Sequence, residues 1–193
     1  CRLKADVVIN CIGVLIKGSK EDVKNTIYIN SYLPHFLSAT VSTYGGKLIH
    51  LSTDCVFSGK KGGYIESDFR DADDVYGRSK ALGEINNSLD LTIRTSIIRP
   101  ELKKKGEGLF SWIKNQSGKV SGFSSAFWSG ITTYELAKFI DFAIENNLAG
   151  LINATNNEKI SKFDLISIIR KIYNLYNIEI VADSEKVIDK SLL

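Results

Sequence analysis

Several residue types are absent or scarce in this chain of 193 residues. Methionine is absent, and proline and histidine occur only twice each. No apolar run approaches the ~20 residues of a membrane-spanning helix, which argues against a membrane protein. The three cysteines form no C-x-x-C pair, which predicts free thiols in a reducing cytoplasm, and no His/Cys cluster indicates a metal site. Cys11 and Cys55 lie on or beside predicted strands, where a thiol is most often a small core residue.

The balance of charge is that of an ordinary globular protein. Hydrophobic residues make up 44% of the chain and charged residues 24%, and the formal net charge is +3. The basic residues alternate with acidic ones and form no stripe, which argues against a nucleic-acid partner. A chain of this length can bury a substantial core as one domain.

The stretch over residues 47–84 carries the chemistry. Residues 47–51 form an apolar, β-prone run that is typical of a buried parallel strand, and residues 52–54 (S-T-D) follow at its carboxyl end, where ligands bind in open α/β sheets. A helical segment then places Tyr76 and Lys80 at i, i+4, on one helix face. A phenol and an ammonium aimed at a strand-end hydroxyl form a proton-transfer apparatus. A nearby cation lowers the pKa of a phenol from its usual ~10 toward a useful value.

The same residues resemble a known family. Thr53 with Y-x-x-x-K at Tyr76 and Lys80 is similar to the Ser/Thr-Tyr-Lys signature of short-chain dehydrogenases/reductases. The fuller string S-T-D-C-V-F-S-G, then Y-x-E-x-D, then Y-G-R-S-K-x-x-G-E, is similar to the extended branch that acts on nucleotide sugars, and within it most similar to dTDP-4-dehydrorhamnose reductases. This resemblance implies an α/β fold, a Rossmann-like doubly wound parallel sheet with a small C-terminal substrate-binding part.

The resemblance also implies an activity and a set of site residues. It implies NADPH- or NADH-dependent reduction of the 4-keto group of a nucleotide-diphospho-6-deoxy-sugar, in the biosynthesis of cell-surface polysaccharide sugars. Tyr76 would protonate the carbonyl oxygen, Lys80 would lower the pKa of Tyr76 and hold the cofactor ribose, and Thr53 would hydrogen-bond the same oxygen. The further cofactor contacts that it implies are Cys11, Ile12, Gly13, Thr95 and Ser96. The substrate contacts that it implies are Asp54, Val56 and Phe57.

We expect the chain to be a fragment. A complete member of the family begins with a strand, a G-x-x-G-x-x-G turn and a helix that hold the dinucleotide pyrophosphate, and no such motif stands near the start of this sequence. The first two βα units are therefore expected to be missing. We expect residues 1–99 and 129–155 to form a partial NAD(P)-binding core and residues 100–128 and 156–193 to form the substrate-binding part. Whether the protein is a homodimer stays open.

Other functions of the same fold also stay open. Dehydratases of the superfamily carry an Asp-Glu pair after the threonine, whereas Asp54 is followed here by Cys55, which disfavours dehydration. An NAD-dependent epimerase is the next alternative to simple reduction, followed by a non-catalytic, cofactor-binding regulatory subunit. A purely structural fragment would bind no cofactor. The lysines at 103–105 are more typical of a solvated surface than of a diphosphate site.

The rest of the chain alternates between strand and helix patterns. Residues 20–44 predict a helix that is kinked or restarted at Pro34, and residues 56–74 predict a long loop over the site. Further strands are expected at 5–11, 91–98, 150–155 and 178–182, and one within 119–128. Further helices are expected at 75–86, 109–115, 132–146 and 161–174. Thr132 and Ser161 are expected to cap the last two of these helices.

Overall fold

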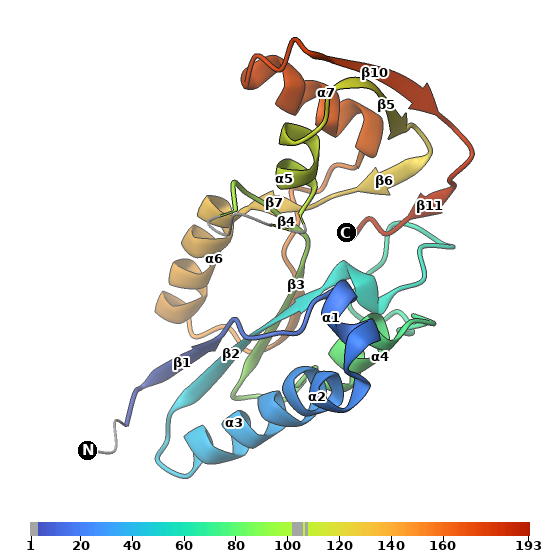
Figure 1. The fold of residues 1–193 in the computed structure, drawn as a ribbon. Helices are drawn as coiled ribbons and strands as arrows, with labels where there is room; N and C mark the ends of the chain where they lie inside the picture. Colours follow the sequence, from blue (N-terminus) through green and yellow to red (C-terminus); the bar gives the residue numbers. More distant parts are fainter. Residues whose placement is uncertain (1–3, 102–105, 107) are drawn as a thin grey trace.

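The computed structural model describes residues 4–101, 106 and 108–193 (Figure 1). Its centre is a sheet of four parallel strands in the order β1-β2-β3-β8. The strands are β1 (Val7–Asn10), β2 (Lys47–Thr53), β3 (Leu91–Thr95) and β8 (Gly150–Asn153). β2 and β3 lie inside the sheet and are buried on both faces, as continuous apolar runs predict. The expected fold class, α/β with a Rossmann-like parallel sheet, is confirmed.

Helices cover both faces of this sheet (Figure 1). α6 (Thr133–Glu145) packs on the face that carries Ile49 of β2. α3 (Leu33–Ser42) and α4 (Val75–Leu82) contact β2 on the opposite face, which carries His50 because neighbouring strand residues point to opposite sides. None of the helices in the described part of the chain has the length and apolar character that a bilayer crossing requires.

The helical segment between β1 and β2 consists of four pieces instead of one kinked helix. The pieces are α1 (Ile16–Glu21), α2 (Val23–Ile27), the π-helix η1 (Tyr28–Tyr32) and α3. Pro34 is the second residue of α3, and the chain enters α3 from η1 without leaving the helical conformation. The wider π turn directly before it gives the proline ring room against the carbonyl four residues earlier. The helix is therefore disrupted near the expected place, and the disruption takes the form of a π turn before the proline.

β1 is the edge strand of the central sheet, so it is less buried than its apolar sequence indicates. β2 is its partner among the described residues. Asn10 is its only buried residue, and Ile9 is 44% exposed. Cys11, directly after the strand, is exposed and is not the core residue that we expected, while Cys55 is half-buried; both are free thiols.

A second group of elements lies beyond the carboxyl ends of the central strands (Figure 1). Residues 119–128 contribute two strands to it instead of the expected one. The group contains α5 (Leu109–Lys114), α7 (Lys162–Ile172), a parallel pair of β5 (Gly118–Phe123) and β10 (Ile178–Asp183), and β6 (Ala126–Trp128) between β9 (Ile160–Ser161) and β11 (Ile188–Asp189). It has a hydrophobic core of its own, made of Phe110, Ile113, Val120, Trp128, Leu165, Ile166, Ile169 and Ile178.

The chain passes from one group to the other directly after β3. The strand expected over residues 91–98 is divided there, because β3 ends at Thr95 and β4 (Ile97–Ile98) pairs with β7 (Ile131–Thr132) outside the central sheet. The helix expected over residues 75–86 ends at Leu82, before Gly83. The two predicted helix caps are confirmed. Thr132 Oγ1 accepts the backbone N–H of Glu135 at 3.1 Å, and Ser161 Oγ accepts the backbone N–H of Asp164 at 3.0 Å.

Candidate active site

β2 delivers a hydroxyl and a carboxylate to the carboxyl edge of the sheet. After Thr53 the chain turns into a short 3-10 helix, η2 (Asp54–Val56). The Thr53 hydroxyl donates to Asp54 Oδ1 at 3.0 Å and accepts the backbone N–H of Cys55 at 3.1 Å. Thr53 and Asp54 are 8% and 7% exposed. The strand end therefore presents a fixed hydroxyl beside a buried carboxylate.

α4 brings Tyr76 to this hydroxyl. Asp74 caps the helix by accepting the N–H of Gly77 at 2.8 Å. A Cβ on Gly77 would lie 2.3 Å from the carbonyl oxygen of Cys55, so glycine is what allows the helix to approach η2 this closely. The Tyr76 phenol then lies near the Thr53 side chain, which acts on its pKa. The structure thus brings together two of the three side chains that we expected to be catalytic.

The Tyr76 phenol retains its proton at neutral pH. Burial raises its pKa well above the usual 10.0, and the neighbouring Cys55, Asp54 and Asp74 add to the rise because they disfavour a phenolate. The contact with Thr53 acts in the opposite direction. Burial, followed by Asp54, raises the pKa of the Cys55 thiol to about 12. The site therefore holds a protonated phenol, the state from which a proton is donated.

The Lys80 amine contacts the central sheet in this structure. Its Nζ donates to the backbone oxygen of Leu51 at 2.6 Å and lies 3.4 Å from His50 Nε2. Burial lowers the pKa of Lys80 to about 8, against the attraction of Glu84. Lys80 is not among the groups with the largest effects on the pKa of Tyr76. The expectation that Lys80 lowers the pKa of Tyr76 stays a prediction, and in this structure the long side chain of Lys80 turns toward the sheet.

The expected cofactor contacts after β1 lie in an exposed turn. Residues 11–13 are all exposed, and Ile12 is 58% exposed. The fully buried amide of Asn30 fixes the end of this turn: its Oδ1 accepts the N–H of Val14 at 2.8 Å, and its Nδ2 donates to the oxygen of Val14 at 3.0 Å and to Ser79 Oγ at 3.1 Å. Asn30 therefore ties the turn to α4, the helix that carries Tyr76.

The two expected contacts after β3 have different surroundings. Thr95 is buried, with 5% exposure, at the last position of the strand. Ser96 Oγ accepts the indole N–H of Trp128 at 2.6 Å. Ser96 therefore links the end of the central sheet to the second group of elements.

Two of the three expected substrate contacts lie in the core. Val56 and Phe57 are 0% exposed, and the Phe57 ring stacks on Tyr64 with ring centroids 4.1 Å apart. A fully buried side chain offers no surface to a ligand, so the expected contact does not hold for these two side chains. The third residue, Asp54, does line a cleft.

This cleft, of about 680 Å³, opens between the carboxyl edge of the sheet and the second group of elements. Its size is typical of small-molecule sites. Asp54, Cys55 and Ser96 line it from the sheet side, while Thr53 and Tyr76 lie beside it and are not among its lining residues. The opposite wall is aromatic and basic, with Trp112, Phe123, Trp128, Lys162, Lys186 and Lys190. The expectation for the lysines at 103–105 lies outside the described residues.

Sequence reasoning missed the basic residues of the cleft. They are spread singly over β5, α7 and the segment after β10, so no run or motif marks them, and only the fold brings them together. Burial lowers the pKa of Lys162, while Asp54 and Cys55 across the cleft act against this. The cleft therefore combines an amine with a carboxylate on opposite walls.

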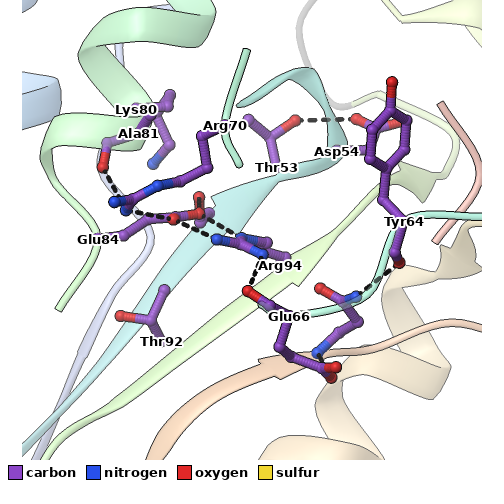
Figure 2. A network of polar contacts seen from close by, with 12 residues as sticks. Thr53, Asp54, Tyr64, Glu66, Arg70, Lys80, Ala81, Glu84, Thr92 and Arg94 are labelled. Atoms are coloured by element: carbon purple, nitrogen blue, oxygen red, sulfur yellow. Dashed lines mark hydrogen bonds and ion pairs between the residues drawn. The ribbon is translucent and has the colours of Figure 1, made fainter. Parts of the chain in front are cut away.

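A buried ionic network lies under the site (Figure 2). Sequence reasoning missed it, although Arg94 inside the apolar run of β3 indicated a buried charge. Glu84 Oε1 accepts from Arg94 Nε at 2.8 Å and from Ser52 Oγ at 2.6 Å. Glu84 Oε2 accepts from Arg94 Nη2 at 2.8 Å and from Arg70 Nη1 at 3.0 Å. The network joins the end of α4, the strands β2 and β3 and the loop that follows η2. It holds α4 against the sheet at the depth at which Tyr76 meets Thr53.

The fold and the strand-end residues define a Rossmann-like α/β protein with a ligand cleft at the carboxyl edge of its sheet. The chain belongs to the RmlD family: the family model described as the RmlD substrate binding domain matches residues 2–189.

The chain is similar to several named proteins. A dTDP-4-dehydrorhamnose reductase of Mycobacterium tuberculosis is 35% identical over 85 residues, which are 41% of this chain and 28% of that protein. The spore coat polysaccharide biosynthesis protein SpsK of Bacillus subtilis is 34% identical over 95 residues, 48% of this chain and 33% of that protein. The chain thus spans about a third or less of the curated relatives that it matches.

Solved structures share the fold over nearly the whole chain. A hypothetical dTDP-4-dehydrorhamnose reductase from Sulfolobus tokodaii has a TM-score of 0.81 and 27% identity, and the match covers 97% of this chain and 70% of that one. The dTDP-4-dehydrorhamnose reductase of Bacillus anthracis, in complex with NADP, has a TM-score of 0.82 and 21% identity over 98% of this chain and 72% of that one.

Proposed function

We propose that this chain supplies the catalytic residues and the sugar-binding cleft of a nicotinamide-dependent reductase. Its reaction is reduction of the 4-keto group of a nucleotide-diphospho-6-deoxy-sugar, as in the dTDP-4-dehydrorhamnose reductases to which it is similar. The observation that carries the proposal is the proximity of the Tyr76 phenol to the Thr53 side chain at the end of β2. Asp54, the next residue, lines the cleft that we assign to the substrate.

The side chains divide the work on the ketone. Tyr76, protonated at neutral pH, donates its proton to the carbonyl oxygen as negative charge develops there. The Thr53 hydroxyl donates a hydrogen bond to the same oxygen, for which it exchanges its bond to Asp54. Asn30 keeps the turn after β1 and the helix of Tyr76 in register.

The residues at the strand ends fit one side of a nicotinamide cofactor, NADPH or NADH. A Cβ on Gly13 would meet only Asn30 Oδ1, at 3.5 Å, so the backbone of this turn is open to close approach. We assign cofactor contacts to residues 11–13, Tyr76, Lys80, Thr95 and Ser96. When bound, the reduced nicotinamide supplies the hydride. To hold a cofactor ribose, the Lys80 amine would exchange the hydrogen bond that it donates to the Leu51 oxygen.

We further propose that the chain divides into two functional parts. Residues 1–99 and 129–155 form a partial NAD(P)-binding core, and residues 100–128 and 156–193 bind the substrate. The separate hydrophobic cores of the sheet and of the second group support this division. The lysines and aromatic rings of the cleft suit a diphosphate and the flat ring of a base.

The cellular role follows from the same proposal. A product of this kind is a sugar donor for cell-surface polysaccharide, and the Bacillus subtilis relative is named for the biosynthesis of spore coat polysaccharide. The free thiols and a nicotinamide-dependent reduction both suit the reducing cytoplasm.

Oxidation of NADPH or NADH by a dTDP-4-keto-6-deoxy-sugar, measured with the purified protein, tests the proposal. Tyr76→Phe should lower turnover at least ~100-fold, because it removes the proton donor and leaves the ring. Tyr134→Phe is the matched control, since Tyr134 is 71% exposed on α6. Equal turnover in the two variants would refute the role of Tyr76. A wild-type protein that binds cofactor without oxidising it would favour the regulatory subunit.

A further inference from the structure

Three buried polar side chains lie in a row behind the site. Asn10 of β1, His50 of β2 and Lys80 of α4 are 2%, 0% and 5% exposed. Asn10 Nδ2 lies 3.1 Å from His50 Nδ1, and His50 Nε2 lies 3.4 Å from Lys80 Nζ. At its Asn10 end the row reaches the backbone of Ile12, whose N–H donates to Asn10 Oδ1 at 3.1 Å.

The hydrogen atoms of this row have two possible arrangements, which differ in the charge of Lys80. Because Asn10 Oδ1 already accepts from Ile12, the amide NH₂ faces His50, and His50 Nδ1 must accept. A neutral imidazole that accepts at Nδ1 carries its hydrogen on Nε2, which faces Lys80. An N–H cannot donate to an ammonium, so this arrangement requires the neutral amine of Lys80. The ammonium form of Lys80 requires the reverse arrangement, with the hydrogen of His50 on Nδ1. The Asn10 amide must then turn over so that its oxygen faces His50, and the N–H of Ile12 loses its acceptor.

The surrounding charges keep His50 neutral and bring Lys80 close to its point of change. Burial lowers the pKa of His50 to about 3, and Lys80 and the more distant His35 of α3 add to this. Burial lowers the pKa of Lys80 to about 8, against the attraction of Glu84 on the α4 side and Cys11 after β1. Lys80 therefore changes its charge at mildly alkaline pH, while His50 can change only its tautomer.

We propose that Asn10 and His50 are positioning residues that couple the charge of Lys80 to the hydrogen bonding of the Ile12 backbone. When Lys80 takes a proton from solvent, His50 releases the proton on Nε2 and takes one at Nδ1, so the charge of the ring is unchanged. Asn10 then turns over and releases the N–H of Ile12. The coupling rests on these contacts alone. Its meaning for the reaction rests on the proposed function, because Ile12 and Lys80 are both assigned to the cofactor.

NMR spectroscopy of the 193-residue chain, without cofactor or substrate, tests this coupling. The nitrogen shifts of ¹⁵N-labelled histidine rings report the tautomer, and the chain has only two histidines, of which His35 is identified by a His35→Gln variant. Between about pH 6 and about pH 10 we expect His50 to change from the Nδ1–H to the Nε2–H tautomer. The Lys80 ¹³Cε signal and the Ile12 amide signal should share the same midpoint.

Two variants separate coupling from a purely structural role. Lys80→Met should abolish the titration of both His50 and Ile12 in this range. Asn10→Ala should leave His50 titrating while the Ile12 amide becomes insensitive. The proposal is overturned by an Ile12 amide that stays constant while Lys80 titrates, or by a His50 ring that keeps one tautomer on both sides of the Lys80 midpoint. The wild-type titration decides even where a variant does not fold, and a negative result leaves the proposed reductase function standing.

Discussion

Arg94 binds the buried carboxylate of Glu84 (Figure 2). Replacing Arg94 tests how much this buried ion pair contributes to stability. The Arg94 and Glu84 side chains are 2% and 0% exposed, and two hydrogen bonds of 2.8 Å join them. Arg70 also donates to Glu84, at 3.0 Å, but its side chain is 43% exposed. Arg94→Met removes both buried bonds while it retains a long apolar stem. Arg70→Met is the matched control, because it removes one bond to the same carboxylate.

The two variants should differ several-fold in their effect on stability. Arg94→Met should lower the free energy of unfolding by ~3–5 kcal/mol, because it leaves a buried carboxylate without its main counter-charge. Arg70→Met should lower it by ~1 kcal/mol or less, since water screens an exposed pair. A double variant, Glu84→Gln with Arg94→Met, should lose less than the sum of the two single losses, because a neutral amide needs no counter-charge.

Urea unfolding of the 193-residue chain, followed by circular dichroism, measures each free energy. The variants can be compared only if their m-values agree with that of the wild type. Equal losses for Arg94→Met and Arg70→Met would refute the reasoning, because they would show that burial of the pair is unimportant. Additive losses in the double variant would refute it as well.

Three further predictions follow from single contacts. Gly77→Ala should lower stability by ~1–3 kcal/mol in thermal or urea unfolding, because its Cβ would lie 2.3 Å from the oxygen of Cys55; an unchanged stability would contradict the close approach of α4. The folded-state pKa of Lys80 is about 8 against an unfolded value of 10.5, so its destabilising effect is complete below pH 8 and is lost by pH 10.5. The stability of the wild type relative to Lys80→Met should therefore rise by up to ~3 kcal/mol across this window, and a constant difference would argue against a buried amine. Ser161→Ala should lower the free energy of unfolding by ~1 kcal/mol, because Ser161 Oγ accepts the N–H of Asp164 at 3.0 Å. Ser161→Thr should retain most of that stability in the same urea unfolding measurement.

Local rules were enough to place the elements of the central sheet. Apolar runs predicted its four strands, and the capping residues Thr132 and Ser161 predicted the starts of α6 and α7. Strand direction then put Thr53 at a carboxyl edge, and i, i+4 spacing put Tyr76 and Lys80 on one helix. These features depend on neighbours within a few residues, so the sequence expresses them directly.

The direction and surroundings of side chains depended on the tertiary structure. Lys80 lies on the predicted helix, but His50 and the Leu51 oxygen, thirty or so positions away, decide where its amine points. The depth at which β1 and Cys11 are buried depended on which strands lie beside them.

The sequence by itself therefore determined the fold class and the residues that meet at the end of β2. Only the tertiary structure decided that Val56 and Phe57 are core residues, that Glu84 is held by Arg94, and that scattered lysines line one cleft. The physical reason is range: hydrogen-bonded turns and residue periodicity act between near neighbours, whereas burial and charge pairing depend on every segment that packs nearby.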